Sequence, residues 1–273
     1  MTTTTGGAAN VMSKLEDYLQ TEWPELNVFL TSVTDHYATA SVCGPNAKKI
    51  INKIFKDLDL SDENFPHMSF KEVKLDNINC RVMRISFTGE LSYEINVEAS
   101  YGKYIWEKCI DAGKEFNITP YGTETMHLLR AEKGFIIVGQ DTDGTMTPID
   151  LQMDWIISKK KYDFIGKRSL YRSDTIREDR KQLVGLLTDD PNEILEEGAQ
   201  IVQEENKKPV DMLGHVTSSY FSPTLKKSIA LAVLKKGKQL KGQKLLIPMI
   251  DKTIKVTVSD TVFLDKENER ING

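Results

Sequence analysis

The stretch Phe87-Thr-Gly-Glu-Leu-Ser-Tyr-Glu-Ile-Asn-Val97 alternates apolar and polar residues from Leu91 onward. Successive side chains of a β-strand point to opposite faces, so each set of residues shares one face. The pattern predicts a strand that buries one face and holds Glu94 on the other. The apolar set is Leu91, Tyr93, Ile95 and Val97, and the polar set is Ser92, Glu94 and Asn96.

Glu94 is the first candidate for chemistry in this stretch. A carboxylate held in the middle of a strand can accept two parallel N–H bonds from a planar 2-amino-4-oxo heterocycle such as a pterin. Such charge-assisted bidentate pairs supply orientation as well as energy. The spacing is equally consistent with an ordinary glutamate that faces solvent, so both interpretations stay open at this point.

Helix and strand patterns alternate on both sides of this strand. Ser13 is expected to cap the first helix, and Gly134 is expected to end the last helix of this half. The helices are predicted over 13–22, from Gly44-Pro45 to Phe55, over 99–115 and over 121–133, and the strands are predicted within 27–43 and 70–98. This half of the chain therefore predicts an α+β body.

The pattern changes after residue 171. Residues 172–182 are polar and charged without apolar periodicity, which is typical of a linker between domains. Beyond them, short strand patterns separated by turn residues predict a small β-barrel or sandwich. The strand patterns are 183–187, 199–203, 214–218, 229–234, 244–250 and 253–258, and the turn residues are Asn206, Pro209, Pro223, Gly237 and Gly242. The predicted domains are therefore 1–171 and 183–273.

The composition excludes several classes of protein. The 273 residues include 36 Lys and Arg against 40 Asp and Glu, so the formal net charge is 36 − 40 = −4. No chain-wide basic field exists to hold nucleic acid. Apolar runs are far shorter than the roughly 18 residues of a membrane-spanning helix, and the N-terminus lacks a signal-peptide pattern. The three cysteines, Cys43, Cys80 and Cys109, are widely separated, which suits a reducing cytoplasm.

Generic catalytic motifs are absent from the sequence, which contains no G-x-G-x-x-G, P-loop, G-x-S-x-G or H-E-x-x-H pattern. Its histidines are His36, His67, His127 and His215, and they show no metal-ligand spacing, so no metal site is predicted. The basic run Lys159–Arg168 holds six basic residues in ten. It is either a solvated face or a dock for an anionic tail, such as the carboxylates of a folate.

The order of several motifs resembles that of the aminomethyltransferase (glycine-cleavage T-protein) family. These motifs are Gly89-Glu-Leu-Ser-Tyr-Glu94, Leu129-Arg-Ala-Glu-Lys-Gly134, Thr147-Pro148, Asp163-Phe-Ile-Gly-Lys167, His215-Val-Thr-Ser218, Ser222-Pro223 and Ile229-Ala-Leu-Ala232. The amino-acid sequence of these motifs is more similar still to that of the C-terminal folate-binding half of the heterotetrameric sarcosine oxidase alpha subunit. That finer match rests on Met1-Thr-Thr-Thr-Thr-Gly-Gly-Ala8, Tyr121-Gly-Thr-Glu-Thr-Met-His127 and Val138-Gly-Gln-Asp-Thr-Asp-Gly144.

This resemblance implies a folate-binding α+β body followed by a C-terminal β-barrel, with tetrahydrofolate as the ligand. In the family the second Glu of the G-E-x-x-[YF]-E motif grips the pterin, which points to Glu94, beside Tyr93. A tyrosine that often lines the family pocket is replaced by Phe87. An arginine that helps to hold folate in aminomethyltransferases is replaced by Met126, whose thioether cannot pair with a carboxylate. This replacement favours the sarcosine oxidase branch.

The family's catalytic Asp lies upstream of the segment that matches residues 2–8. The resemblance therefore implies that this chain lacks the first part of the folate domain, as a fragment, a split gene product or the result of a misplaced start codon, and no catalytic residue is assigned in it. We expect the domain to capture the one-carbon unit from sarcosine oxidation as 5,10-methylenetetrahydrofolate. The flavin (FAD or FMN) and NAD are expected elsewhere in a complex with beta, gamma and delta subunits.

Two other functions stay open. The chain could be a stand-alone aminomethyltransferase of the glycine cleavage system or a related folate-dependent demethylase. It could also be a non-catalytic interaction protein. The amine oxidised, the oligomeric state and any flavin contact are not predicted by the sequence.

Overall fold

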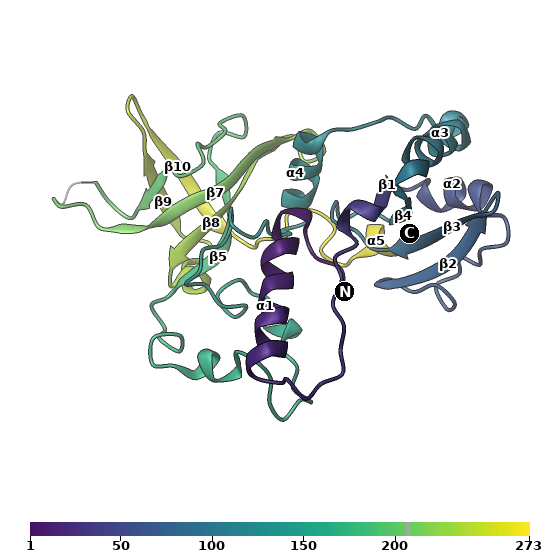
Figure 1. Cartoon of the computed structure of the whole chain (residues 1–273). Coiled ribbons are helices and arrows are strands. Elements are labelled where there is room, and N and C mark those ends of the chain that lie inside the picture. The colour runs from purple at the N-terminus through teal and green to yellow at the C-terminus, as the bar shows by residue number, and fades with distance from the viewer. Residues whose placement is uncertain (206–207) are drawn as a thin grey trace. The chain divides into compact units, whose positions relative to one another are not determined.

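The computed structural model describes residues 1–205 and 208–273, so the predicted turn at Asn206 lies outside the described residues. The chain forms two compact units (Figure 1). Unit 1 comprises Met1–Ser86, Glu90–Pro120 and Ile271–Gly273, and unit 2 comprises Phe87–Gly89 and Tyr121–Arg270. Residues 121–170 therefore belong to the same compact unit as the C-terminal barrel. The domain bounds drawn at 171 and 183 from composition stay a prediction.

Unit 1 is built on a four-stranded antiparallel sheet in the order β1-β4-β3-β2. Its strands are β1 (Tyr37–Cys43), β2 (Ser69–Leu75), β3 (Ile78–Arg84) and β4 (Ser92–Glu98). Its main helices are α1 (Ala8–Thr21), α2 (Ala47–Ile54) and α3 (Gly102–Gly113), and α5 (Glu269–Asn272) reaches it at its end. Helices α2 and α3 contact each other and strands β1 and β4, so the hydrophobic core lies between this helix pair and one face of the sheet.

The predicted alternation in β4 is confirmed. Tyr93, Ile95 and Val97 are buried in the core, while Glu94 and Asn96 keep partial exposure on the other face. The apolar stripe predicted after Gly44-Pro45 is also confirmed, because α2 buries Ile50, Ile51 and Ile54 and Phe55 follows them into the core. These two patterns share one cause. An element that buries a single face has apolar residues at every second position if it is a strand, and at about every 3.6 positions if it is a helix.

One prediction near the N-terminus is wrong. The first helix begins at Ala8 rather than at Ser13, because Ala8 and Ala9 are strong helix formers and continue the helix toward Gly7. The prediction of one or two strands within 27–43 is confirmed as a single strand, β1, from Tyr37 onward. Strand β1 pairs with β4 from Cys43↔Ser92 to Tyr37↔Glu98. Strand β4 ends at Glu98, opposite the first residue of β1. Residues 27–33 therefore have no continuation of β4 to pair with, despite their β-branched residues.

Unit 2 contains a closed barrel with the strand order β10-β5-β8-β7-β6-β9. Its strands are β5 (Lys181–Thr188), β6 (Gln200–Val202), β7 (Met212–Ser222), β8 (Lys227–Lys235), β9 (Lys244–Pro248) and β10 (Thr253–Ser259), and its helix is α4 (Thr123–Glu132). Every strand predicted after residue 183 is present, and the choice between a barrel and a sandwich is decided for the barrel. Gly134 follows α4 with φ +75°, as expected for a residue that ends a helix.

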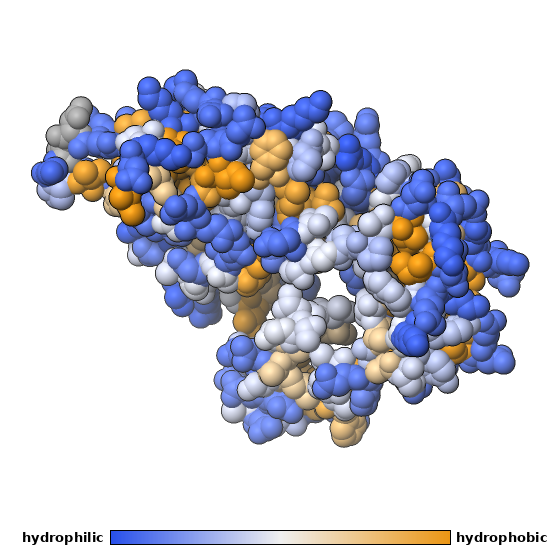
Figure 2. Space-filling model, turned by 90° about the horizontal axis from the view of Figure 1, so that it is seen from above, coloured by the Kyte–Doolittle hydropathy of each residue, from blue (hydrophilic) through white to orange (hydrophobic). Residues whose placement is uncertain are grey.

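Short 3₁₀ turns connect these elements, at Thr5–Gly7, Thr34–His36, Ala99–Tyr101, Lys114–Phe116, Asp154–Ile156, Lys167–Tyr171 and Gly237–Leu240. The surface seen in Figure 2 is mostly hydrophilic, with separate hydrophobic patches between charged areas. No helix among the described residues is both long and apolar enough to span a membrane.

Candidate functional site

The face of the unit 1 sheet opposite α2 and α3 carries the candidate site. We call it the outer face, and the strand alternation and register define it by the side chains of Tyr37, Thr39, Ser41, Cys43, Phe70, Glu72, Lys74, Asn79, Arg81, Met83, Ser92, Glu94, Asn96 and Glu98. Glu94 lies near its middle, because β4 is an inner strand of the sheet. It is paired with Ser41 of β1 on one side and with Met83 of β3 on the other.

Glu94 is partly buried on this outer face. Burial raises the pKa of its carboxyl group above the ordinary glutamate value. In the part of the chain that the structure describes, no side chain or backbone N–H is bonded to this carboxylate. A carboxylate that has lost water without gaining a protein donor is poised to accept hydrogen bonds from a ligand.

The polar neighbours of Glu94 bond to one another instead. Ser41 Oγ lies 3.3 Å from Ser92 Oγ, and Thr39 Oγ1 donates to Asn96 Oδ1 at 2.7 Å. The groups on both sides of Glu94 along β1 and β4 therefore have partners within the sheet. The acceptor capacity of the Glu94 carboxylate is left for a molecule that lies on this face.

The other residues predicted to bind the ligand lie elsewhere. Tyr93 is fully buried on the opposite face of β4, with its ring centroid 5.9 Å from that of Phe65. Phe87 is exposed and Met126 half-buried on α4, and both belong to unit 2. The structure therefore places Glu94 and Tyr93 on opposite faces of one strand. The ligand contacts assigned to Tyr93, Phe87 and Met126 stay predictions.

Several residues of the resemblance motifs form a buried polar network in unit 2. The fully buried Arg130 of α4 donates to Asp141 and, at 2.6 Å, to Ser218 Oγ of β7. Ser222 of β7 donates to the Glu132 carboxylate. This network joins α4 to the barrel strand β7. The sequence showed these residues only as motif members, because Ser218 lies 88 residues from Arg130 and Ser222 lies 90 residues from Glu132 along the chain.

The beginning of the Gly89–Glu94 motif packs against the same helix. Lys133 is 5% exposed, and its Nζ lies 2.8 Å from Oδ2 of the buried Asp265. Gly89 has φ +79°, and a Cβ there would lie 2.8 Å from the Cβ of Lys133. Only glycine fits this close approach without displacing the lysine. The motif thus starts on unit 2 at Phe87–Gly89 and continues into unit 1.

The segment predicted as a polar linker ends in a buried ion pair. Arg180 is 8% exposed, and its guanidinium lies 2.8 Å from Asp150 and 2.9 Å from Asp174. The buried Asp150 also accepts from the backbone N–H of Thr147. Composition did not predict the ion pair between Arg180 and Asp150, because residues 172–182 are uniformly polar in sequence.

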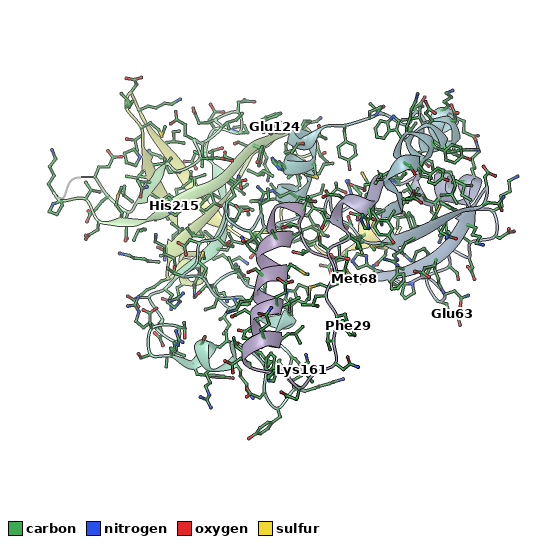
Figure 3. All side chains as sticks on the ribbon, viewed as in Figure 1. Phe29, Glu63, Met68, Glu124, Lys161 and His215 are labelled. Carbon is green, nitrogen blue, oxygen red and sulfur yellow. The ribbon has the colours of Figure 1, made fainter. Side chains whose placement is uncertain are left out.

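The basic run Lys159–Arg168 lies in a loop region of unit 2. Its lysines 159–161 are exposed, and Figure 3 labels Lys161. His215 lies on β7, and burial lowers the pKa of its imidazole. Within residues 1–205 and 208–273, no group of three or more His, Cys, Asp or Glu side chains is arranged to hold a metal ion.

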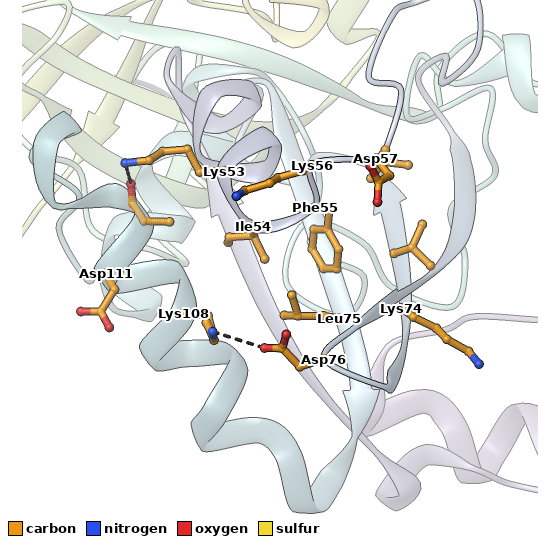
Figure 4. Close-up of a pocket in the computed structure, with 13 residues that line it drawn as sticks. Lys53, Ile54, Phe55, Lys56, Asp57, Lys74, Leu75, Asp76, Lys108 and Asp111 are labelled. Atoms are coloured by element: carbon orange, nitrogen blue, oxygen red, sulfur yellow. Dashed lines mark hydrogen bonds and ion pairs between the residues drawn. The ribbon is translucent and has the colours of Figure 1, made fainter.

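A groove of about 920 Å³ lies between the end of α2, the β2–β3 turn and α3 (Figure 4). Lys53 donates to the Ala112 carbonyl at 3.4 Å, and Lys108 lies 3.4 Å from Asp76. Both cations therefore already have protein partners. The carboxylate of Glu94, in contrast, has no such partner among the described residues.

The comparisons with known proteins agree with this architecture. Residues 1–161 match the family model of the GCVT N-terminal domain, and residues 181–265 match that of the glycine cleavage T-protein C-terminal barrel domain. The chain also matches the crystal structure of the glycine cleavage system aminomethyltransferase T from Bartonella henselae, with a TM-score of 0.76 and 20% identity. That match covers 96% of this chain and 67% of the other, and it shows a shared fold.

Curated relatives fall into two groups. The sarcosine oxidase subunit alpha of Corynebacterium sp. (strain P-1) is 52% identical over 277 residues, and that of Rhizobium meliloti (strain 1021) is 39% identical. Each match covers this whole chain but only 28% of the relative's length. The aminomethyltransferase of Thermoanaerobacter sp. (strain X514) is 32% identical, over 89% of this chain and 64% of its own length. Because the N-terminal family model alone covers more than half of the residues, the chain belongs to the glycine cleavage T-protein family.

Proposed function

We propose that this chain is the tetrahydrofolate-binding portion of a sarcosine oxidase-type alpha subunit, and that it captures the one-carbon unit released by amine oxidation. The observation that carries the proposal is the partly buried Glu94 carboxylate, which has no partner among the residues that the structure describes. The higher identity to sarcosine oxidase alpha subunits than to an aminomethyltransferase favours this branch.

The donor pattern of a reduced pterin fits Glu94. Its amino group and adjacent ring N–H form two parallel donors, and a carboxylate accepts such a pair with both oxygens. Because Glu94 stands on an inner strand of a four-stranded sheet, the paired strands on both sides hold its backbone in place. A ligand gripped there is oriented by a rigid element rather than by a loop.

The chemistry supplied by bound tetrahydrofolate is that of two amines, N5 and N10, which together take up a carbon at the oxidation level of formaldehyde. The proposed product is 5,10-methylenetetrahydrofolate. The part assigned to this chain is to bind the pterin, to orient its amines and to limit the access of water. Holding reactants in a fixed geometry contributes several kcal/mol to lowering a barrier. We assign no proton-transfer residue in this chain.

The wider setting belongs to the same proposal. Flavin and NAD would reside elsewhere in the complex, and the partners would be the beta, gamma and delta subunits of such an oxidase. A cytoplasmic location is supported by the cysteines, since the chain has only three, Cys43, Cys80 and Cys109, and they are widely separated in the sequence.

The test is titration calorimetry with tetrahydrofolate under anaerobic conditions. We expect the wild-type chain to bind and Glu94→Gln to weaken binding by about 100-fold, because two hydrogen bonds to a charged acceptor are each worth about 1.5–3 kcal/mol. Glu98→Gln is the matched control on the same face of the same strand, and it should bind as the wild type does. Equal affinities of the wild type and Glu94→Gln would refute the role of Glu94, and absence of binding by the wild type would favour an interaction protein.

A further inference from the structure

We propose that two copies of this chain associate through two exposed strips of opposite charge, so that each strip of one copy lies against the other strip of its partner. The acidic strip is residues 22–35, between α1 and β1, and the basic strip is residues 155–172, ahead of β5. This inference goes beyond the proposed function, because it requires neither Glu94 nor a bound folate.

Both strips expose large apolar side chains, and neither range contains a buried residue. Phe29 of the acidic strip is 90% exposed and Tyr162 of the basic strip is 95% exposed. The other exposed apolar side chains are Trp23, Leu26, Val28 and Val33 in the acidic strip, and Trp155, Ile156, Ile165 and Tyr171 in the basic strip. Single apolar residues on a surface are normal, but gatherings of this kind between charged residues are typical of surfaces that another protein covers.

The two strips carry opposite charges. The acidic strip contains Glu22, Glu25 and Asp35 and no lysine or arginine, so its formal charge is −3. The basic strip contains six cations and the single carboxylate of Asp163, so its formal charge is +5 in a chain whose total is −4. The cations are Lys159, Lys160, Lys161, Lys167, Arg168 and Arg172. Within residues 1–205 and 208–273, no charged side chain of either strip forms an ion pair, so these charges are available to a partner.

The basic strip is held at both ends by one arginine. Arg180 lies 2.8 Å from Asp150, which precedes the strip, and 2.9 Å from Asp174, which follows it. Just beyond the strip, Thr175 Oγ1 donates to the carbonyl of Arg172 at 3.0 Å. The loop is therefore closed before a partner arrives, and less conformational entropy is lost on association.

The acidic strip is likewise attached to regular structure at both ends. The backbone N–H of Trp23 donates to the Tyr18 carbonyl of α1 at 2.9 Å, and the two rings lie 5.2 Å apart. At the other end the N–H of His36 donates to the Val33 carbonyl at 3.0 Å, directly before β1 begins at Tyr37. The exposed side chains between these points are therefore carried by a segment with two fixed ends.

A second copy of this chain supplies the complement of each strip. In a two-fold dimer the acidic strip of each copy meets the basic strip of the other, so the same contact forms twice and the assembly closes. The two strips together comprise 32 residues, and stable interfaces use about 20–30 residues a side. A small anion would neutralise part of the basic strip but leave the apolar side chains of both strips in water.

The experiment is sedimentation velocity of the whole chain over a wide range of concentrations, at low and at high salt. We expect a dimer that weakens at high salt, because salt screens charges at a surface. The basic-strip variant carries Lys159→Glu, Lys160→Glu and Lys161→Glu, and the acidic-strip variant carries Glu22→Lys and Glu25→Lys. Each set reverses the sign of its strip and is expected to weaken the dimer by at least about tenfold, because like charges then face each other.

An equal mixture of the two variants gives the sharpest test. The mixed dimer sets opposite charges against each other at both contacts, so it is expected to form at concentrations where neither variant dimerises alone. Misfolding of one variant cannot produce this recovery. The matched control reverses three exposed lysines outside both strips, Lys56→Glu, Lys235→Glu and Lys255→Glu, and it should dimerise as the wild type does.

The apolar part of the contact is tested by Phe29→Ala and Tyr162→Ala, each of which is expected to weaken the dimer about tenfold. A wild type that stays monomeric at every concentration, strip variants that dimerise as the wild type does, or a mixture that stays monomeric would each overturn the proposal. A basic-strip variant that keeps the dimer but loses affinity for tetrahydrofolate would assign that strip to the folate tail instead. None of these results depends on Glu94, so they are distinct from a failure of the proposed function.

Discussion

Glu94 is the residue proposed to bind the pterin, and glutamine is its neutral isostere. The substitution Glu94→Gln is expected to stabilise the ligand-free protein and to weaken ligand binding. Glu94 is partly buried, and its carboxylate has no donor among the residues that the structure describes. A fully buried, unsatisfied acceptor costs about 1–3 kcal/mol. Because Glu94 keeps some contact with solvent, we take the lower end, about 1 kcal/mol. Glutamine removes the buried charge and keeps the volume of the side chain.

The stabilisation should depend on pH in a defined direction. Burial raises the pKa of Glu94 in the folded state, so the folded chain binds its proton more readily than the unfolded chain does. Stability therefore falls as pH rises from the unfolded pKa to the folded pKa, and the full cost is present above the folded pKa. At low pH the protonated glutamate resembles glutamine. The advantage of Glu94→Gln should then vanish.

The assay is thermal unfolding of the wild type, Glu94→Gln and Glu98→Gln at pH 7.5 and pH 4.0, without ligand. A gain of about 1 kcal/mol corresponds to a rise in Tm of about 2–4 °C for units of this size. We expect that rise for Glu94→Gln at pH 7.5 only. Glu98 is exposed and accepts from Ser100, so Glu98→Gln should change Tm little at either pH. A lower Tm for Glu94→Gln at pH 7.5, or a gain independent of pH, would refute the reasoning.

Three further predictions test the rest of the structure. Asp141→Asn breaks a fully buried ion pair and should lower the free energy of unfolding by about 3–5 kcal/mol in urea titration; a loss below 1 kcal/mol would contradict its structural role. Gly134→Ala should lower Tm more than the control Gly139→Ala. Both glycines have a positive φ, but only a Cβ at position 134 would lie 2.5 Å from the carbonyl oxygen of Thr261. Equal losses of Tm in the two variants would contradict this contact. Burial raises the pKa of Cys109 to about 12. Iodoacetamide at pH 8 should therefore label Cys109 only after denaturation, as measured by peptide mass spectrometry. Rapid labelling of Cys109 in the folded chain would contradict its burial.

Local periodicity accounts for the elements that were predicted correctly. The apolar stripe of α2 and the alternating strand β10 each bury one face, which imposes a period of 3.6 or of two on the sequence, whereas β8 is buried on both faces from Ser228 to Leu234 and was marked by its continuous apolar run. The error in the start of the first helix has the same origin. Helix α1 has no buried residue, so no burial pattern marks its first turn. The residues before β1 have strand propensity but no strand to pair with.

The buried polar network escaped prediction for a different reason. Arg130 and Asp141 look like surface residues in a sequence that is 28% charged. Their burial depends on Ser218, which the barrel brings to α4 from far along the chain. A charge is tolerated inside a protein only where such partners meet it, and the sequence does not state which partners meet.

The sequence by itself determined the face of β4 on which Glu94 lies, because a strand alternates its side chains whatever it pairs with. It also determined the family, through motifs spread over the whole chain. Only the tertiary structure decided that Glu94 lies between Ser41 and Met83 with no donor from the described part of the chain, and that Arg81 stands one row away beside two aromatic rings. These relations follow from the order and register of four strands, which pairing between distant segments sets and which no local pattern encodes.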